Sequence, residues 1–242
     1  MNWDQSNGRI TAGVSLDIPG MSYKHPETGI ISGFEPDLVR LVAHEILGST
    51  DGVEFLQVKD AERVQDLRSG RVDVVVSQMT ITPDRAEQVD FSKPYCVTRE
   101  GLLVPSGSSI TCFDDLREKR IAVTEGSISL RRMRTAIPSL PGATLVVTPF
   151  SVENLEAVVK DEADAASNDM INLTMLRASL AEPEAYSIID IGNRFDLKPF
   201  GMAVRKGNSA LLELLNQVIA SLQDNGEIDR MLTKSLTILN KF

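Results

Sequence analysis

Cysteine and histidine are scarce in this chain of 242 residues, which has two of each. Cys96 and Cys112 cannot build a disulfide framework, and neither belongs to a CxxC motif or to a Cys/His cluster with the spacing of a zinc site. We therefore expect two free thiols and no metal site. The histidines, His25 and His44, are interpreted as a loop residue and a residue on a helix surface.

Motifs of common enzymes and cofactor sites are missing too. The chain has no GxSxG, HExxH, P-loop or GxGxxG pattern. This favours a protein that is not an enzyme and that carries no cofactor. One pair of carboxylates, Glu125 and Asp169, could act as general acid and base, although solvated loop positions are the simpler interpretation.

Long apolar runs are also absent. No stretch reaches the roughly 18 consecutive apolar residues of a membrane-spanning helix. The start, Met1 to Gln5, has neither the basic region nor the apolar region of a signal segment. We expect a soluble chain without membrane insertion, but not necessarily a cytoplasmic one, because a mature secreted protein given a new initiating Met would look the same.

Basic residues are outnumbered, with 25 Lys and Arg against 34 Asp and Glu and a formal net charge of −9. This charge argues against nucleic acid or an anionic lipid surface as the main partner. Any anion that the protein binds must be held by local cations. The remaining composition, 42% hydrophobic and 24% charged, is that of a globular protein, and the length suits one large domain or two small ones.

Apolar residues at strand and helix spacing alternate along the first part of the chain. The pattern predicts strand, loop, helix, strand, helix and strand at residues 9–16, 17–33, 36–47, 53–58, 61–69 and 72–77. Gly48 is expected to end the first helix. This βαβαβ order predicts a parallel sheet that is covered on both faces.

A second alternating series predicts a second parallel sheet. Two extended stretches, 94–104 and 195–204, lie at the boundaries between the series. We infer an α/β protein of two lobes, residues 1–98 with 199–242 and residues 99–198, joined by a two-strand hinge with a cleft between the lobes. The further segments are expected at residues 121–123, 126–137, 144–148, 152–160, 163–167, 170–180, 210–224 and 226–239.

Ligands of open α/β sheets bind beyond the carboxyl ends of the strands, which directs attention to three loops. The first runs from Gln78 through Met79 and Thr80 to Arg85. The Thr80 hydroxyl can donate or accept a hydrogen bond, and a guanidinium can grip a carboxylate through two parallel bonds. A surface arginine on a short helix is the alternative interpretation of Arg85.

Two helix starts in the second lobe provide the other loops. Gly126 and Ser127 open a helix whose amides and dipole can bind an anion. Asp169, at a second helix start, suits an ammonium because a carboxylate stays ionised there. Either Ser127 or Asp169 taken alone can be an ordinary N-cap. Together the three loops offer partners for both ends of a free amino acid.

Five motifs follow one another along nearly the whole chain. They are Gly33 to Leu38, Thr80 to Arg85 continuing from Val89 to Tyr95, Gly126 with Ser127, Ala163 to Ala165 with Asp169, and Phe200 to Lys206. In this order they resemble the extracytoplasmic solute-binding proteins, family 3, of polar amino acid ABC importers. The resemblance implies a two-lobed periplasmic-binding-protein-like fold of type II, with two parallel-rich sheets, flanking helices and a two-strand hinge.

The resemblance also implies a role for each matching residue. Arg85 would hold the α-carboxylate of the ligand, together with backbone amides near Ser127 and Ile128. Asp169 would hold the α-ammonium. The ligand-binding set is completed by Thr80, the backbone carbonyl of Gln78, and Met79 between them.

Arg63 sits where acidic-amino-acid binders of this family carry an arginine that meets the side-chain carboxylate of the ligand. The resemblance therefore favours glutamate or aspartate, with a plain surface arginine as the alternative. Two departures weaken this assignment, because Ser15 replaces a Lys or Arg of several such binders and Ile128 replaces a common Thr or Ser. Asparagine and glutamine therefore stay open as ligands.

The function implied by the resemblance is amino acid transport. We expect a monomeric, extracytoplasmic protein, periplasmic or lipid-anchored at the cell surface, whose lobes close on the ligand and whose closed state is read by the membrane permease of an ABC importer. Catalytic residues are not expected. Two alternatives remain: a ligand-sensing domain of a receptor, and an enzyme like the cyclohexadienyl dehydratases on the same scaffold.

Overall fold

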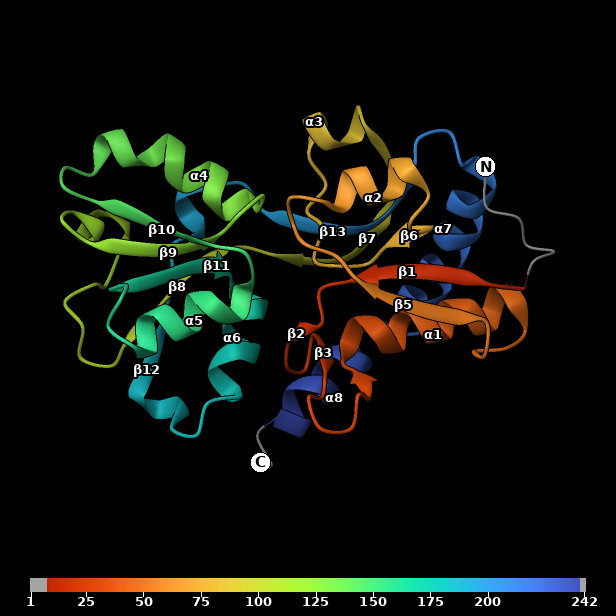
Figure 1. Ribbon diagram of the computed structural model, residues 1–242, viewed down its shortest axis with the longest axis horizontal. Helices are drawn as coiled ribbons and strands as arrows, with labels where there is room; N and C mark the ends of the chain where they lie inside the picture. Colours follow the sequence, from red (N-terminus) through yellow and green to blue (C-terminus); the bar gives the residue numbers. More distant parts are fainter. Residues whose placement is uncertain (1–7, 240–242) are drawn as a thin grey trace. The chain divides into compact units, whose positions relative to one another are not determined.

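The computed structural model describes residues 8–239 of the chain (Figure 1). The interpretation of Met1 to Gln5 lies outside these residues. Within them the chain divides into two compact units. Unit 1 holds residues 8–16, 20–97 and 199–238, and unit 2 holds residues 17–19, 98–198 and 239.

The sheet of unit 1 is mixed and begins with strands whose order the sequence predicts. β1 (Ile10–Val14) pairs in parallel with β5 (Val53–Gln57) and with β6 (Val74–Val75). β13 (Lys198–Arg205) is antiparallel to β6, and β7 (Val89–Thr98) lies at the edge of the sheet. The parallel βαβαβ part is thus as predicted, and the returning chain adds the antiparallel neighbour.

Helix α1 (Phe34–Leu47) follows the predicted helical spacing closely. Its buried face includes Leu38, Val39, Val42 and Ile46, and the helix contacts β1, β5 and α7 (Ser209–Asp224). Gly48 ends the helix in the left-handed region, with a φ of 75°, where the absence of a Cβ removes the steric cost. The other helices described in unit 1 are α2 (Arg63–Ser69), α3 (Pro83–Ala86) and α8 (Glu227–Leu239).

The sheet of unit 2 is mixed and not parallel throughout, which corrects the prediction made from segment order. β9 (Arg120–Thr124) is parallel to β10 (Thr144–Thr148) and to β11 (Ala165–Asp169). β8 (Glu100–Pro105) pairs antiparallel with β11 and with β12 (Tyr186–Asp190). The sequence analysis missed β12 because its residues are half-buried in succession and show no alternation of buried and exposed positions.

Helices cover both faces of this sheet. Figure 1 shows α4 (Ile128–Ala136) on one face and α5 (Ser151–Val159) with α6 (Met170–Ala178) on the other. The apolar core beside α4 includes Leu102, Val104, Ile121, Val123, Leu130 and Met133. Short 3₁₀ turns are found at Phe113–Leu116, Ile137–Ser139, Pro183–Ala185 and Gly192–Arg194.

The Gly/Pro-rich segment predicted as a loop at residues 17–33 contains short strands. β3 (Ser22–Lys24) pairs antiparallel with β4 (Ile31–Ser32), and β2 (Asp17–Ile18) precedes them. Strands of two or three residues are too short for a period-two pattern to be recognised in a sequence. The Gly and Pro residues of the segment therefore led to the prediction of a loop.

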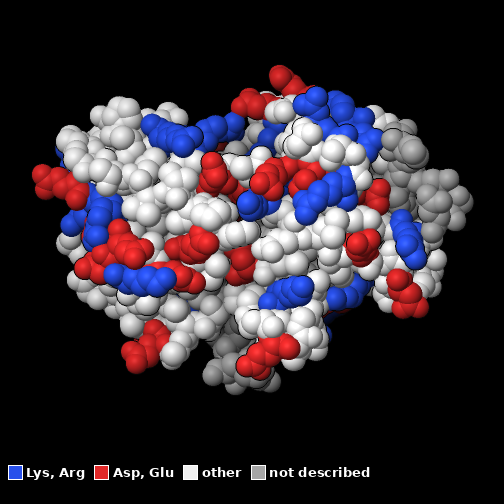
Figure 2. Space-filling model, viewed as in Figure 1, with Lys and Arg blue, Asp and Glu red and all other residues white. Residues whose placement is uncertain are grey.

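Three whole-chain expectations can be compared with the described residues. No helix within residues 8–239 has the length and apolar character needed to cross a membrane. Cys96 is half-buried, Cys112 is exposed, and no disulfide joins them. On the face drawn in Figure 2, basic and acidic side chains are interspersed, so the net charge of −9 does not form one continuous negative field there.

Candidate functional site

The loop that follows β6 is held firmly in unit 1. Gln78 has a φ of 46°, a left-handed conformation that is uncommon outside glycine, and its main-chain N–H donates to Glu35 Oε1 over 2.7 Å. Met79 is buried, and its carbonyl accepts from Gly201 N over 3.2 Å. Thr80 is buried as well and forms a β-bridge with Phe200. These bonds fix the orientation of the main chain between β6 and α3.

Arg85 reaches back onto this loop from α3. Thr82 caps α3 by accepting from Arg85 N over 3.4 Å, and Pro83 provides the first helical residue. The guanidinium of Arg85 is half-buried, and its Nη1 donates to the carbonyl of Thr80 over 2.9 Å. The structure thus brings Thr80 and Arg85 together and places the cation of Arg85 beside the loop from Gln78 to Thr80.

Arg63 is buried, with 2% of its surface exposed, and is not the surface arginine that was the alternative interpretation. Its Nη1 donates to the carbonyl of Ser77 over 2.5 Å, and its Nε donates to the carbonyl of Asp60 over 3.3 Å. Its Nη2 lies 3.2 Å from the Asp60 carboxylate. The charge of Arg63 is therefore already paired, while the residue adjoins the loop that starts at Gln78.

Two buried hydroxyls in unit 1 were not singled out by sequence as a pair. Ser15 and Ser77 each lie two residues beyond the paired positions Gly13 and Val75 of the parallel strands β1 and β6. Their Oγ atoms are buried and have no hydrogen-bond partner among residues 8–239. An unpaired buried hydroxyl costs free energy, so these two atoms are candidate ligand contacts.

Two of the predicted residues lie at the start of α4 in unit 2. Ser127 is its N-cap and accepts from Leu130 N over 3.0 Å, as the N-cap interpretation predicts. Gly126 precedes it with a φ of 74°, and Ile128 is buried at the first helical position. The capping does not exclude anion binding, because the first-turn amides and the helix dipole remain favourable to negative charge.

Asp169 is the N-cap of α6 and is 2% exposed. Its Oδ1 accepts from Asn172 N over 2.9 Å, and the main-chain N–H of Asp169 also acts on the carboxylate. Burial raises the pKa of this carboxyl from 3.8 to about 6, against the lowering effect of the Lys198 charge. A buried carboxylate is suited to an ammonium, because the opposite charge offsets the cost of burying its own.

The two helix starts share one edge of the sheet in unit 2. β9 and β11 are parallel neighbours, so the residues after Thr124 and the residue Asp169 lie beyond the same carboxyl ends. Ser151 Oγ joins them, at 3.2 Å from Thr124 Oγ1 and 3.1 Å from Asn168 Nδ2. Ser127, Ile128 and Asp169 therefore lie at one edge of the sheet of unit 2.

A buried ionic cluster next to Asp169 was missed by the sequence analysis. Glu100 is fully buried and pairs with Lys198 Nζ over 3.1 Å and with Arg132 Nη1 over 3.0 Å. Ser167 donates to the same carboxylate over 3.0 Å. Glu100 lies 98 residues from Lys198 in sequence, and neither belongs to a recognisable motif, so no local pattern could have paired them.

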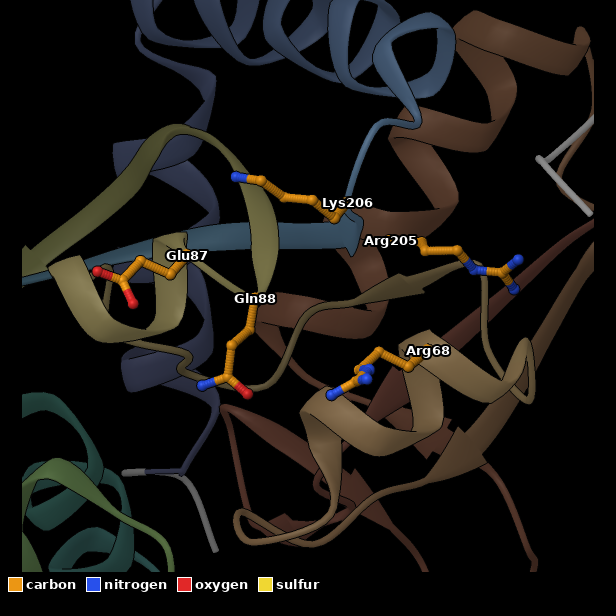
Figure 3. Close-up of a pocket in the computed structure, with 5 residues that line it drawn as sticks. All are labelled: Arg68, Glu87, Gln88, Arg205 and Lys206. Atoms are coloured by element: carbon orange, nitrogen blue, oxygen red, sulfur yellow. The ribbon is translucent and has the colours of Figure 1, made fainter.

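A separate pocket of about 440 Å³ on unit 1 contains none of the predicted site residues (Figure 3). It is lined by Arg68, Glu87, Gln88, Arg205 and Lys206. Figure 3 shows Arg68 and Gln88 directed toward each other, while Arg205 and Lys206 leave the end of β13 in opposite directions. Lys206 is already paired with Asp90 at 2.8 Å.

The α/β fold of the two units indicates the class of protein, and the helix starts at Ser127 and Asp169 agree with it. Solved structures that are similar to the chain are type II periplasmic binding proteins, as the predicted fold class requires. The sequence model of the bacterial extracellular solute-binding proteins, family 3, matches residues 10–237. The chain belongs to this family of extracellular solute-binding proteins.

Relatives of this chain bind amino acids. It is similar to the ABC transporter glutamine-binding protein GlnH of Bacillus subtilis, with 30% identity over 231 residues, covering 95% of this chain and 82% of the relative. It is 25% identical over 240 residues to the glutamate-binding protein GluB of Corynebacterium efficiens, covering 95% and 79%. The structure of a solute receptor for L-cysteine of Neisseria gonorrhoeae matches with a TM-score of 0.86 and 29% identity, covering 97% and 92%.

The free protein is expected to become more stable as the pH falls from 8 to about 5. Burial raises the pKa of Asp169 from 3.8 to about 6 and that of Glu35 from 4.5 to about 7. The folded state therefore binds these two protons more tightly than the unfolded state. Their stabilisation is fully present below the unfolded pKa values and is lost as the pH rises through about 6 and 7, by up to about 3 kcal/mol for each carboxyl.

Urea unfolding of the ligand-free protein at pH 5.5, 7 and 8 measures this effect. Asp90 and Asp164 have lowered pKa values, and their opposite contribution is lost only near and below pH 3.8, outside the chosen range. The double variant Glu35→Gln, Asp169→Asn should show a much flatter dependence. A free energy of unfolding that is higher at pH 8 than at pH 5.5 in the unaltered protein would contradict the prediction.

Proposed function

We propose that the protein binds a free polar amino acid and delivers it to the membrane permease of an ABC importer. The observation that carries the proposal is the Asp169 carboxylate, which is buried at the N-terminus of α6 with 2% of its surface exposed. Such a group suits the α-ammonium, and Thr80 with the carbonyl of Gln78 would complete the ammonium site. Burial makes the ionised carboxylate costly, as its raised pKa shows, so a cationic ligand group would relieve that cost.

The α-carboxylate would be held by Arg85 together with amides at the start of α4. The guanidinium of Arg85 offers several donors in one plane, which matches a carboxylate. The amides near Ser127 and Ile128 add the favourable end of a helix dipole.

The contacts of Arg63 favour glutamine or asparagine as the ligand. The guanidinium is already paired with Asp60 at 3.2 Å, so a second carboxylate would bring excess negative charge into a buried region. The hydroxyls of Ser15 and Ser77, which have no partner among residues 8–239, can each donate or accept, as a carboxamide requires. Glutamate and aspartate, which the position of Arg63 suggests, are the second candidates.

Thermal unfolding in the presence of each of the twenty amino acids tests the proposal. Bound ligand is first removed by unfolding in denaturant, dialysis and refolding. A ligand present at a hundred times its Kd stabilises the folded state by about 2.7 kcal/mol, which gives a clear rise in Tm. Glutamine or asparagine should give the largest shift, with Kd then measured by calorimetry at pH 8. A shift with glutamate or aspartate alone would assign the acidic ligand, and no shift with any amino acid would refute the function.

The remaining parts of the proposal concern catalysis and location. Because Asp169 and Arg85 suit the charged ends of a ligand, we propose that the protein binds the amino acid without converting it. We also propose that it acts as a monomer and outside the cytoplasm. Incubation with prephenate or arogenate should yield no aromatic product. A sensor role would require the full-length gene to encode a signalling domain next to this chain, whereas a transport role requires a partner permease.

A further inference from the structure

Glu35 places a fully buried carboxylate against the loop of unit 1 that follows β6 and begins at Gln78. It belongs to the first turn of α1, yet its side chain bonds to residues far away in sequence. Tyr95 Oη donates to Oε1 over 2.5 Å, and the main-chain N–H of Gln78 donates to the same oxygen over 2.7 Å. The side-chain amide of Gln78 donates to Oε2. One carboxylate thus holds both the backbone and the side chain of Gln78.

The contact is located where the main chain is strained. Gln78 has a φ of 46°, and residues with a Cβ rarely adopt this conformation unless their surroundings impose it. The two bonds to Glu35 are the interactions that hold Gln78 from the side of α1. The carbonyl of Gln78 and Thr80, two residues further on, belong to the proposed ammonium site. The conformation that Glu35 imposes on Gln78 therefore sets how this carbonyl faces a ligand.

Few charged or titratable side chains act on Glu35. Arg63 of α2 and Tyr95 of β7 are the charged and titratable side chains that act on it, and Cys96 acts on Tyr95 in turn. Tyr95 is itself buried between the rings of Phe34 and Phe200. Burial raises the pKa of Glu35 to about 7, opposed by the hydrogen bonds from Tyr95 and Gln78 and by the charge of Arg63.

We propose that Glu35 is a positioning residue whose ionised carboxylate holds Gln78 in the ligand-binding conformation, so that its protonation in mild acid loosens the loop and weakens amino acid binding. This inference rests on the proposed function. Three donors meet the two oxygens of the ionised group. A proton taken from solvent replaces one acceptor lone pair by a donor and removes the negative charge, which weakens the bonds from Gln78 and Tyr95. A ligand that needs an ordered Gln78 binds the ionised form better and lowers its pKa in return.

The experiment measures the ligand Kd by calorimetry from pH 5.5 to 8.5, with the amino acid that gives the largest thermal shift. Glu35→Gln copies the protonated state, because a carboxamide also replaces one acceptor by a donor. We expect this variant to bind at least about tenfold more weakly at pH 8.5 and to lack the part of the pH dependence that is centred near 7. Glu45→Gln, an exposed residue of the same helix, should behave like the unaltered protein.

Tyr95→Phe separates positioning from a merely structural role. It removes the donor that lowers the pKa of Glu35 most, but leaves both bonds to Gln78. The midpoint of the affinity loss should therefore move to higher pH, while the Kd at pH 8.5 stays close to that of the unaltered protein. This variant also serves if Glu35→Gln does not fold.

A second measurement does not depend on any ligand. The ¹⁵N–¹H resonance of the main-chain amide of Gln78 in the free protein should titrate with a midpoint near pH 7. This midpoint should move to higher pH in Tyr95→Phe, and the resonance should be insensitive to pH in Glu35→Gln. An amide that does not titrate, or a Glu35→Gln variant with unchanged Kd at every pH, overturns the inference even where the amino acid binds. If no amino acid binds, the proposed function fails by itself, and the amide titration decides whether Glu35 controls Gln78.

Discussion

Arg85→Ala is expected to abolish amino acid binding at the concentrations accessible to calorimetry. The guanidinium lies next to the Gln78–Thr80 loop through its bond to the Thr80 carbonyl, and the proposal gives it the α-carboxylate. Loss of the partner of a buried charge costs about 3–5 kcal/mol. This corresponds to an increase in Kd of more than a hundredfold. Arg85→Lys keeps the charge but not the two parallel bonds, so an intermediate Kd is expected.

The fold should survive this substitution because Arg85 is only half-buried and belongs to a helix of four residues. The free energy of unfolding without ligand should change by about 1 kcal/mol or less. Arg68→Ala is the matched control, since Arg68 is an exposed arginine of the same unit and lines the separate pocket of Figure 3. Equal Kd values for Arg85→Ala and Arg68→Ala would remove Arg85 from the binding site.

Local signals explain which parts of the fold could be predicted. Helix α1 was found because its apolar spacing is regular over 14 residues and Gly48 marks its end. The strands β2 to β4 were missed because two or three residues carry no period. The antiparallel direction of β8 was missed because the sequence shows where an extended segment lies but not which strand it will adjoin. Its partners β11 and β12 come more than fifty residues later.

The same distinction applies to the candidate site. Ser127 and Asp169 could be found because an N-cap is a local pattern of residue type and position. The bond between Glu35 and Gln78 joins residues 43 positions apart, and no local rule pairs them. Arg63 shows a further limit, because the resemblance gave its position but not the Asp60 carboxylate that already neutralises it. The pKa of Glu35 is thus set partly by a residue far away in sequence, and such a partner comes only from the fold.

Asp169→Asn is expected to raise the Kd for an amino acid by more than a hundredfold while leaving α6 intact. Asn is as good an N-cap as Asp, so its side-chain oxygen can still accept from Asn172 N. The lost charge is the proposed counter-ion of the α-ammonium, and an unpaired buried ammonium costs about 3–5 kcal/mol. An analogue with hydrogen in place of the ammonium should bind weakly, but equally well to both forms. The double comparison of protein and ligand thereby assigns the loss to this one contact.

The pH dependence gives the same assignment a second readout. With the pKa of free Asp169 raised to about 6, the bound ammonium must lower it, and binding therefore releases a proton between about pH 4 and 7. Affinity should fall up to tenfold per pH unit below 6 in the unaltered protein, and this part of the dependence should be missing in Asp169→Asn. Calorimetry at pH 6 in buffers of different ionisation enthalpy measures the released proton directly. If both proteins release the same number of protons, the ammonium is bound elsewhere, because no other group in this proposal would change its charge only when Asp169 is present.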